Sequence, residues 1–290
     1  MNLIKKNTYE QHDNEQGSFY KSSVIPFKNS EILENNLNEE ICIIGGGLTG
    51  ISSALHLAKK GYSVSLFEAR KIGWGASGRN GGHLGIGMRK DQKFLEKILG
   101  INHAKELWKL GLESVDLSLE LISNYNIDCA IQKGIISAGV YHNDEYYFKS
   151  DIEHMNKVYN FNKYKFLSQR DINNEINSKI YKSGLLNSSC YHINPLKFLL
   201  GLANELKKLN VKIYENTPIT MIKNHKDGIK IFTNNYEIKA KKVVVGCNGY
   251  LDKLLGRVRN KFMPINNYII ATEPLGKDLA SKLIKRNCGV

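Results

Sequence analysis

The chain has 290 residues, 42% of them hydrophobic and 24% charged, a composition typical of a globular protein large enough to bury a core without disulfide bonds. Its net charge of +13 comes from 41 basic and 28 acidic residues, and because the basic residues are scattered rather than gathered in a stripe, we expect no nucleic-acid partner. Five cysteines without a C-x-x-C pair indicate a reducing compartment, the cytoplasm, and we expect no metal site.

The first 39 residues are interpreted as an N-terminal arm. They are polar and lack sustained apolar periodicity, so we expect them to be partly ordered at best. The basic start of the chain is followed by polar residues rather than by an apolar core, so no secretory signal peptide is expected.

A strand, a glycine turn and a helix come next. The apolar run 41–44 predicts a buried strand, and residues 51–61 predict a helix that ends at a glycine. Between them, Gly45, Gly47 and Gly50 have the G-x-G-x-x-G spacing. The first glycine allows a tight turn, the second lets a pyrophosphate approach the backbone, and the third lets the helix pack close to the sheet. This stretch therefore predicts a dinucleotide site at the N-terminus of a helix.

A second strand, 63–68, ends in a carboxylate. Glu68 lies 18 residues after Gly50, where its carboxylate can accept both hydroxyls of an adenosine ribose and would repel the 2′-phosphate of NADP. The longest nearly uncharged stretch, 41–58, contains four glycines, so we expect no membrane-spanning segment.

A glycine-rich loop, 72–87, begins where the second strand ends. It could be a flexible surface loop, but Trp74 would be a costly residue to leave exposed there. The loop also starts at the carboxyl edge of the sheet, where open α/β folds bind their ligands. We therefore expect its backbone to contact a cofactor.

The next hundred residues predict a mixed excursion from the nucleotide unit. Apolar spacing and turn residues indicate helices over 91–99, 102–125, 143–160 and 169–176, and strands over 129–132, 135–140 and 181–186. The two strands at 129–140 are expected to join at Lys133 and Gly134.

The parallel sheet is expected to resume after a helix that starts at Asn194 and Pro195, an N-cap followed by a proline in the first helical position. The apolar and alternating runs predict a strand over 211–215, an antiparallel meander over 217–222, 229–233 and 236–239, a buried strand over 242–246 and a final strand over 267–272. A second strand-to-glycine junction, Cys247-Asn-Gly249, follows the buried strand.

This interrupted topology favours FAD over NAD. NAD-dependent dehydrogenases, the alternative, usually continue the β-α-β alternation without a break. The predicted fold class is α/β, with a Rossmann-type FAD-binding domain interrupted by a mixed α+β substrate domain. We place the FAD-binding domain at 40–90 and 194–260, and the substrate domain at 91–193 and 261–290.

Five segments together carry a family resemblance: 43–50, 66–68, 73–82, 243–249 and 270–275. They resemble the D-amino-acid-oxidase-like FAD-dependent oxidoreductases, and within them the group of gamma-glutamylputrescine oxidoreductases. The string Gly73-Trp-Gly-Ala-Ser-Gly-Arg-Asn-Gly-Gly82 is far more specific than the nucleotide fingerprint. Members of this family continue well past the position that matches Val290, which implies that the chain is truncated.

The resemblance implies a noncovalently bound FAD and a set of cofactor-binding residues. These residues are Gly45, Gly47, Leu48, Thr49, Gly50, Glu68, Ala69, Arg70, Ser77, Gly78, Arg79, Asn80, Gly81, Gly82 and Ile219.

The resemblance also implies two-electron oxidation of a C–H bond next to an amine, with a small-molecule amine as the partner, as in putrescine catabolism. Such chemistry needs little acid–base machinery because the cofactor carries the hydride step. His83 is a candidate for tuning the charge near the flavin or for helping to keep the amine neutral, with a hydrogen-bonded structural role as the alternative. A truncated chain that binds FAD without turnover is the alternative function.

Overall fold

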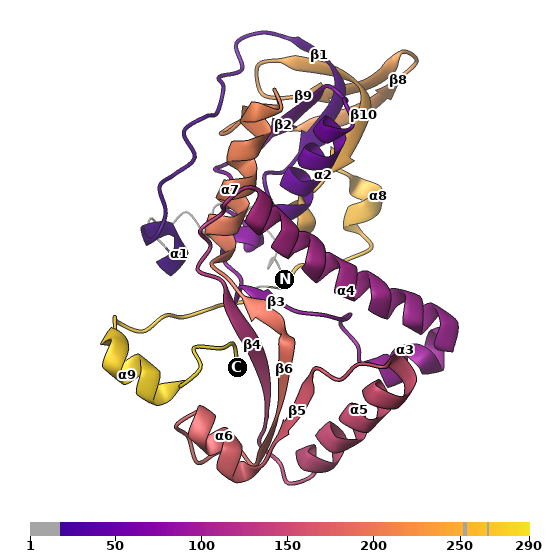
Figure 1. The fold of residues 1–290 in the computed structure, drawn as a ribbon. Helices are drawn as coiled ribbons and strands as arrows, with labels where there is room; N and C mark the ends of the chain where they lie inside the picture. Colours follow the sequence, from indigo (N-terminus) through magenta and orange to yellow (C-terminus); the bar gives the residue numbers. More distant parts are fainter. Residues whose placement is uncertain (1–17, 252–253, 266) are drawn as a thin grey trace, which may run out of the picture. The chain divides into compact units, whose positions relative to one another are not determined.

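The computed structural model describes residues 18–251, 254–265 and 267–290, which form two compact units (Figure 1). The first unit comprises the chain up to Asn80 together with Pro195–Ile269, and the second comprises Gly81–Asn194 and Ile270–Val290. The boundaries between the units therefore lie after residues 80, 194 and 269. The boundaries predicted from the sequence lie after residues 90, 193 and 260.

The described residues of the first unit form four α-helices and the six strands of one sheet, with short 3-10 helices in two loops. Its elements are α1 (Phe19–Ser22), β1 (Leu37–Ile44), α2 (Leu48–Lys59), β2 (Val64–Phe67), η2 (Ala76–Gly78), α7 (Pro195–Lys208), β7 (Lys212–Tyr214), β8 (Met221–His225), β9 (Gly228–Phe232), β10 (Glu237–Val245), η3 (Asn248–Leu251) and α8 (Gly256–Arg259).

The sheet of the first unit has the strand order β7-β2-β1-β10-β9-β8. The pairs from β7 to β10 are parallel, and β10-β9-β8 form an antiparallel meander. The strands predicted at 236–239 and 242–246 are one continuous strand, β10: residues 237–240 pair with β9, and residues 238–245 pair with β1. The structure also starts β1 at Leu37, three residues before the predicted domain start at residue 40.

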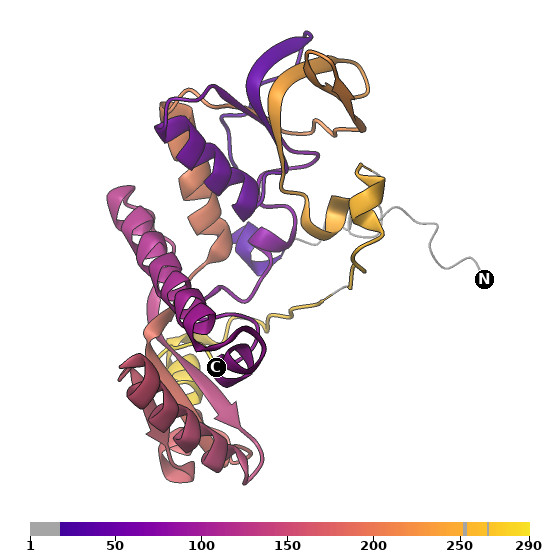
Figure 2. The same ribbon diagram turned by 90° about the vertical axis from the view of Figure 1, so that its right-hand side faces the viewer.

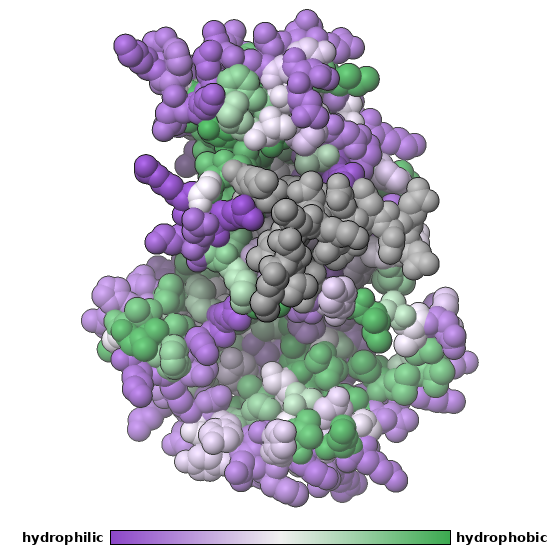
Figure 3. Space-filling view, turned by 180° about the vertical axis from the view of Figure 1, so that it is seen from behind, coloured by the Kyte–Doolittle hydropathy of each residue, from purple (hydrophilic) through white to green (hydrophobic). Residues whose placement is uncertain are grey.

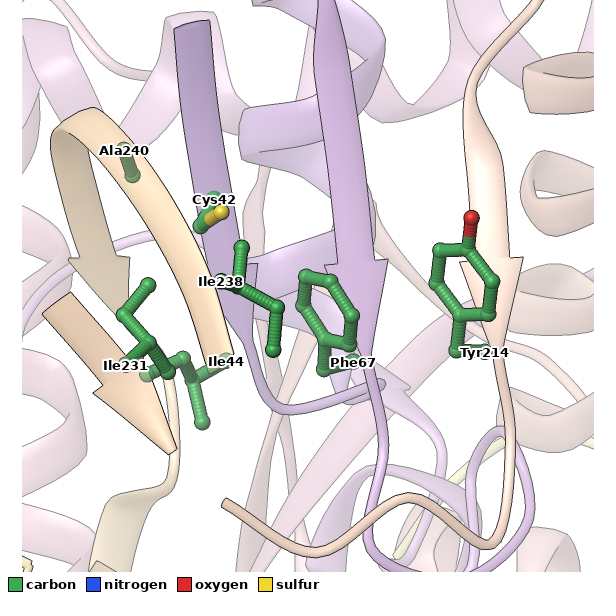
Figure 4. Packing of buried hydrophobic residues seen from close by; sticks show 7 residues of the cluster. All are labelled: Cys42, Ile44, Phe67, Tyr214, Ile231, Ile238 and Ala240. Carbon is green, nitrogen blue, oxygen red and sulfur yellow. The ribbon is translucent and has the colours of Figure 1, made fainter. Parts of the chain in front are cut away.

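The core of this unit follows from the alternation of side chains along buried parallel strands. Figure 4 shows the cluster on one face of the sheet, where the rings of Phe67 and Tyr214 stack with centroids 5.0 Å apart. The cluster consists of Cys42, Ile44, Phe67, Tyr214, Ile231, Ile238 and Ala240. On the opposite face, α2 and α7 lie side by side (Figure 2), with Ile51 and Leu55 of α2 fully buried. The sheet is therefore covered, and only its edges and loops remain for ligands.

The predicted N-terminal arm is only partly described. Residues 1–17 lie outside the described residues, and α1 and an isolated parallel bridge between Glu31 and Tyr214 are the regular features before β1.

The second unit is a small antiparallel sheet with helices. Its elements are β3 (His83–Leu84), α3 (Gln92–Leu99), α4 (Ile101–Asn124), β4 (Gln132–Gly139), α5 (Asp144–Tyr159), β5 (Tyr164–Leu167), α6 (Gln169–Glu175), β6 (Ser183–His192) and α9 (Gly276–Leu283). Strand β6 is central and pairs with β3, β4 and β5.

The structure changes four of the strand predictions made for 129–192 and 267–272. Residues 129–131 form no strand, and a single strand, β4, starts at Gln132 and runs through Gly134 to Gly139; its register shifts between Lys133 and Ile135, so Gly134 is an irregularity rather than a turn. The strand predicted at 181–186 runs instead from Ser183 to His192. Residues 267–272 form no strand, because no described strand pairs with them, and Ile270 is 93% exposed. The short strands β3 and β5 were not predicted.

The helices of the second unit present apolar side chains on their surface. Phe94, Ile98, Leu99 and Ile101, on α3 and at the start of α4, are each at least 41% exposed. In Figure 3, apolar residues gather where these two helices lie.

Candidate functional site

The glycine turn between β1 and α2 is built from backbone contacts that exclude side chains. A Cβ atom on Gly45, whose φ is +109°, would lie 2.7 Å from the carbonyl oxygen of Gly246. A Cβ atom on Gly50 would lie 1.9 Å from the carbonyl oxygen of Gly45. The Gly45 N–H donates to the Phe67 carbonyl at 2.8 Å, which ties the turn to β2. The turn thus brings the N-terminus of α2 close to the ends of two parallel strands, and its positive dipole end suits an anion.

Glu68 lies at the end of β2 and faces this turn. Its carboxylate accepts the N–H of Gly46 at 2.6 Å and the N–H of Arg70 at 2.8 Å. Burial raises the pKa of Glu68, and these two backbone donors oppose the rise. A carboxylate held in this way can accept hydroxyl hydrogens from a ligand beside the glycine turn.

The segment after β2 is tied to the turn and to β7. The Gly73 N–H donates to the Gly46 carbonyl at 3.1 Å. The buried carboxylate of Glu215 accepts the Ile72 N–H at 2.7 Å and pairs with the Lys71 ammonium at 2.9 Å. Hydrogen bonds therefore hold residues 71–73 in place at the start of the glycine-rich loop. This agrees with the expectation, based on Trp74, that the loop is not a flexible surface loop.

Ser77 links the loop to the helix. Its hydroxyl oxygen accepts the Leu48 N–H at 2.9 Å, at the first residue of α2. A Cβ atom on Gly47 would lie 2.9 Å from the same oxygen. Backbone N–H groups and this hydroxyl are the donors that phosphate groups require.

These parts enclose a cavity of about 740 Å³ within the first unit. The volume lies within the range of cofactor and small-molecule sites, roughly 300–1,000 Å³. Seven of the predicted residues line it: Gly45, Gly47, Glu68, Ala69, Arg70, Ser77 and Ile219.

Sequence reasoning missed several residues of the wall. Trp74, Asn248, Tyr250 and Leu254 line the cavity, and so does Cys247. The sequence feature that could have indicated Cys247, Asn248 and Tyr250 is the strand-to-glycine junction at 247–249. This junction lies at the same edge of the sheet as the glycine turn. Burial, and next the charge of Glu68, raise the pKa of the Cys247 thiol to about 11, so this thiol stays protonated near neutral pH.

The other predicted residues lie outside the cavity wall. Leu48, Thr49, Gly50, Gly78, Arg79 and Asn80 belong to the same unit as the cavity without lining it. Gly81, Gly82 and His83 belong to the second unit.

His83 is exposed and sits opposite His192 in the pairing of β3 with β6. Its Nε2 lies 2.9 Å from the position that a Cβ atom on Gly289 would occupy. Its role near a flavin stays a prediction.

The cavity fits a dinucleotide. The Cβ positions of Gly45 and Gly50 are occupied by backbone atoms, so only glycine permits the close approach of turn, helix and strand. The N-terminus of α2 has the kind of donors that a pyrophosphate requires, and the Glu68 carboxylate is an acceptor of the kind that ribose hydroxyls require.

The described residues contain neither a metal-binding cluster nor a helix suited to cross a membrane. No group of three or more His, Cys, Asp or Glu side chains there is placed to hold a metal ion. In the same part of the chain, no helix combines the length and apolar character that a bilayer crossing requires.

Comparison with known proteins shows which family the chain matches. Over residues 40–288 the chain matches the DAO family, described as FAD dependent oxidoreductase. It is 34% identical over 272 residues to gamma-glutamylputrescine oxidoreductase of Escherichia coli, covering 93% of this chain and 63% of that protein. It is 30% identical to the probable oxidoreductase OrdL of Haemophilus influenzae, covering 87% of this chain and 59% of that one. The chain thus spans about 60% of the length of these relatives.

Solved structures agree on the fold. Glycine oxidase of Bacillus cereus superposes with a TM-score of 0.59 at 20% identity, over 76% of this chain and 58% of that one. L-proline dehydrogenase of P. horikoshii superposes with a TM-score of 0.56 at 23% identity, over 76% of this chain and 56% of that one. The mixed α/β fold with a parallel sheet is therefore confirmed, and the family's cofactor confirms FAD rather than NAD. The chain belongs to the DAO family of FAD-dependent oxidoreductases.

Proposed function

We propose that this chain takes part in oxidising the C–H bond next to an amine in a small molecule of the gamma-glutamylputrescine type. The observation that carries the proposal is the 34% identity over 93% of the chain to a gamma-glutamylputrescine oxidoreductase. The cavity around the glycine turn supports it, because it offers separate groups for a pyrophosphate and for a ribose. A cytoplasmic location is part of the proposal and rests on the cysteine pattern.

In this proposal the residues of the first unit hold FAD, which when bound accepts the hydride from the substrate carbon. The N-terminus of α2 and the Ser77 hydroxyl bind the pyrophosphate, and Glu68 accepts the ribose hydroxyls. Ala69 and Ile219 line the cavity beside Glu68 and pack against the nucleoside, and Arg70 lines the same cavity with a cationic side chain. Leu48, Thr49, Gly50, Gly78, Arg79, Asn80, Gly81 and Gly82 keep the cofactor-binding roles that the resemblance implies.

The chemistry asks for positioning more than for acid–base catalysis. The amine must be neutral, since its lone pair assists loss of hydride from the neighbouring carbon. The resulting imine is then hydrolysed by water, which for a primary amine gives an aldehyde and ammonia. His83 is the proposed group for keeping the substrate amine neutral.

An alternative is a chain that binds FAD without turning over an amine. It is favoured by one observation, that the chain spans 59 to 63% of the length of its relatives. Both proposals predict flavin binding, so turnover is the property that separates them.

The test uses the purified chain saturated with FAD in the absence of oxygen. Addition of gamma-glutamylputrescine should bleach the oxidised flavin spectrum, while putrescine, glycine and L-proline should bleach it more slowly. The His83→Ala variant should bleach more slowly than the unmodified chain if His83 has this role. Bound flavin that no amine bleaches would support the alternative, and a chain that never takes up FAD would contradict both.

A further inference from the structure

The side chains that line the cavity do not by themselves supply the positive charge that the pyrophosphate of a bound dinucleotide requires. Among the described residues of its wall, Glu68 is the one acidic and Arg70 the one basic side chain, so the wall has no net formal charge. A dinucleotide brings two negative charges on its pyrophosphate. The dipole at the N-terminus of α2 is equivalent to about half an elementary charge, so it cannot neutralise them alone.

Two guanidinium groups meet at one ring beside this wall. The Cζ atom of Arg79 lies 5.1 Å from the centroid of the Trp74 ring, and that of Arg70 lies 5.8 Å from it. The Arg79 Nε also donates to the Trp74 carbonyl at 2.6 Å, so Trp74 fixes this guanidinium through both its backbone and its ring. Tryptophan is the aromatic side chain that attracts a cation most strongly.

The Trp74 ring is itself held in place. It meets the Tyr250 ring edge to face, with centroids 5.5 Å apart. A Cβ atom on Gly75 would lie 3.0 Å from the Tyr250 ring, so no side chain fits between the loop and η3. The neighbouring Gly73 N–H is bonded to the carbonyl of Gly46 in the glycine turn. The loop that carries the Trp74 ring is therefore hydrogen-bonded to the glycine turn.

We propose that Trp74 is a positioning residue that holds Arg70 and Arg79 where their charges neutralise the pyrophosphate of the bound dinucleotide. Trp74 itself need not contact the pyrophosphate. The role goes beyond packing, because it acts on a charged part of the ligand through two other side chains. It concerns recognition of the cofactor and does not depend on which amine is oxidised.

The proposal is tested with two probes that differ only in the diphosphate, ADP and adenosine, each displacing FAD from the purified chain. Trp74→Leu should weaken ADP binding by roughly three- to tenfold and leave adenosine binding unchanged. It should also flatten the dependence of the ADP dissociation constant on salt concentration, because screened charge contacts are lost. Trp74→Phe keeps an aromatic face and should stay close to the unmodified chain.

Two further variants keep the test decisive if Trp74→Leu fails to fold. Arg79→Gln leaves the ring in place and should show the same loss for ADP alone. Phe94→Leu is the matched control, since it removes a ring 5.2 Å from the Lys90 ammonium in the second unit and should change neither probe. Equal losses for ADP and adenosine, or an unchanged ADP affinity in Arg79→Gln, would overturn the proposal.

Discussion

Replacement of Gly50 by alanine tests the reasoning about the glycine turn most directly. The added Cβ would lie 1.9 Å from the carbonyl oxygen of Gly45, whereas ordinary contacts begin at 3.4 Å. The two atoms must therefore separate by 1.5 Å, and Gly45 cannot move freely because its N–H is hydrogen-bonded to the Phe67 carbonyl. Overpacking of this kind costs about 1–3 kcal/mol, and a backbone clash falls at the upper end. We expect about 3 kcal/mol of lost stability.

The displacement should also reduce FAD affinity, because α2 moves away from the turn that its N-terminus completes. The assays are urea unfolding followed by circular dichroism, and FAD titration followed by flavin fluorescence. Gly256→Ala is the matched control, since nothing lies within 4 Å of its added Cβ and its φ is not positive. If Gly50→Ala and Gly256→Ala have the same unfolding midpoint and the same FAD affinity, the turn does not have the role described.

Three further predictions concern carboxylates and a thiol around the cavity. Because burial raises the pKa of Glu68 above its ordinary value of 4.5, the folded chain binds that proton more tightly than the unfolded chain does. Stability should then fall as pH rises from the unfolded pKa through the folded one, and urea midpoints of Glu68→Gln should lack this component. The same variant should bind FAD about tenfold more weakly, because a charge-assisted hydrogen bond is lost, and an unchanged dissociation constant would exclude the ribose contact. The Cys247 thiol, with its pKa at about 11, should resist alkylation by iodoacetamide near neutral pH. Glu68→Gln should speed this alkylation, because it removes a negative charge that raises the pKa of the thiol. Mass spectrometry of the modified peptide measures both rates. Glu215→Ala should destabilise the chain by about 1–3 kcal/mol, because the buried Ile72 N–H loses its acceptor, while Lys71→Ala, which removes only the exposed partner, should cost much less in the same thermal melts.

Local patterns predicted the nucleotide-binding half of the chain well. The strand, turn, helix and second strand around Gly45 to Glu68 formed as expected, since glycine spacing and apolar runs act over short distances. Helix starts were equally readable: Asp91 caps α3 through the Phe94 N–H, and Ser168 with Asp171 forms a capping box on α6.

Strand continuity could not be predicted in the same way. Strand β10 looked like two strands because its apolar alternation weakens at Lys241 and Lys242, yet pairing with β1 carries it through. Residues 267–272 show the reverse, since an alternating run formed no strand without a partner. A segment forms a strand only where another strand, often distant in the sequence, offers an edge with which it can pair.

The sequence by itself determined that a dinucleotide fold is present and which glycines and which acid shape its turn, because these features depend on neighbours within about thirty residues. Only the tertiary structure showed that Trp74, Cys247 and Tyr250 share one cavity with that turn, and that Glu215 holds the loop between them. Those residues are up to 176 positions apart, from Trp74 to Tyr250, and carry no spacing that a linear pattern can register. They meet because parallel pairing of β1 with β2 and β10 brings the carboxyl ends of distant strands to one edge of a sheet.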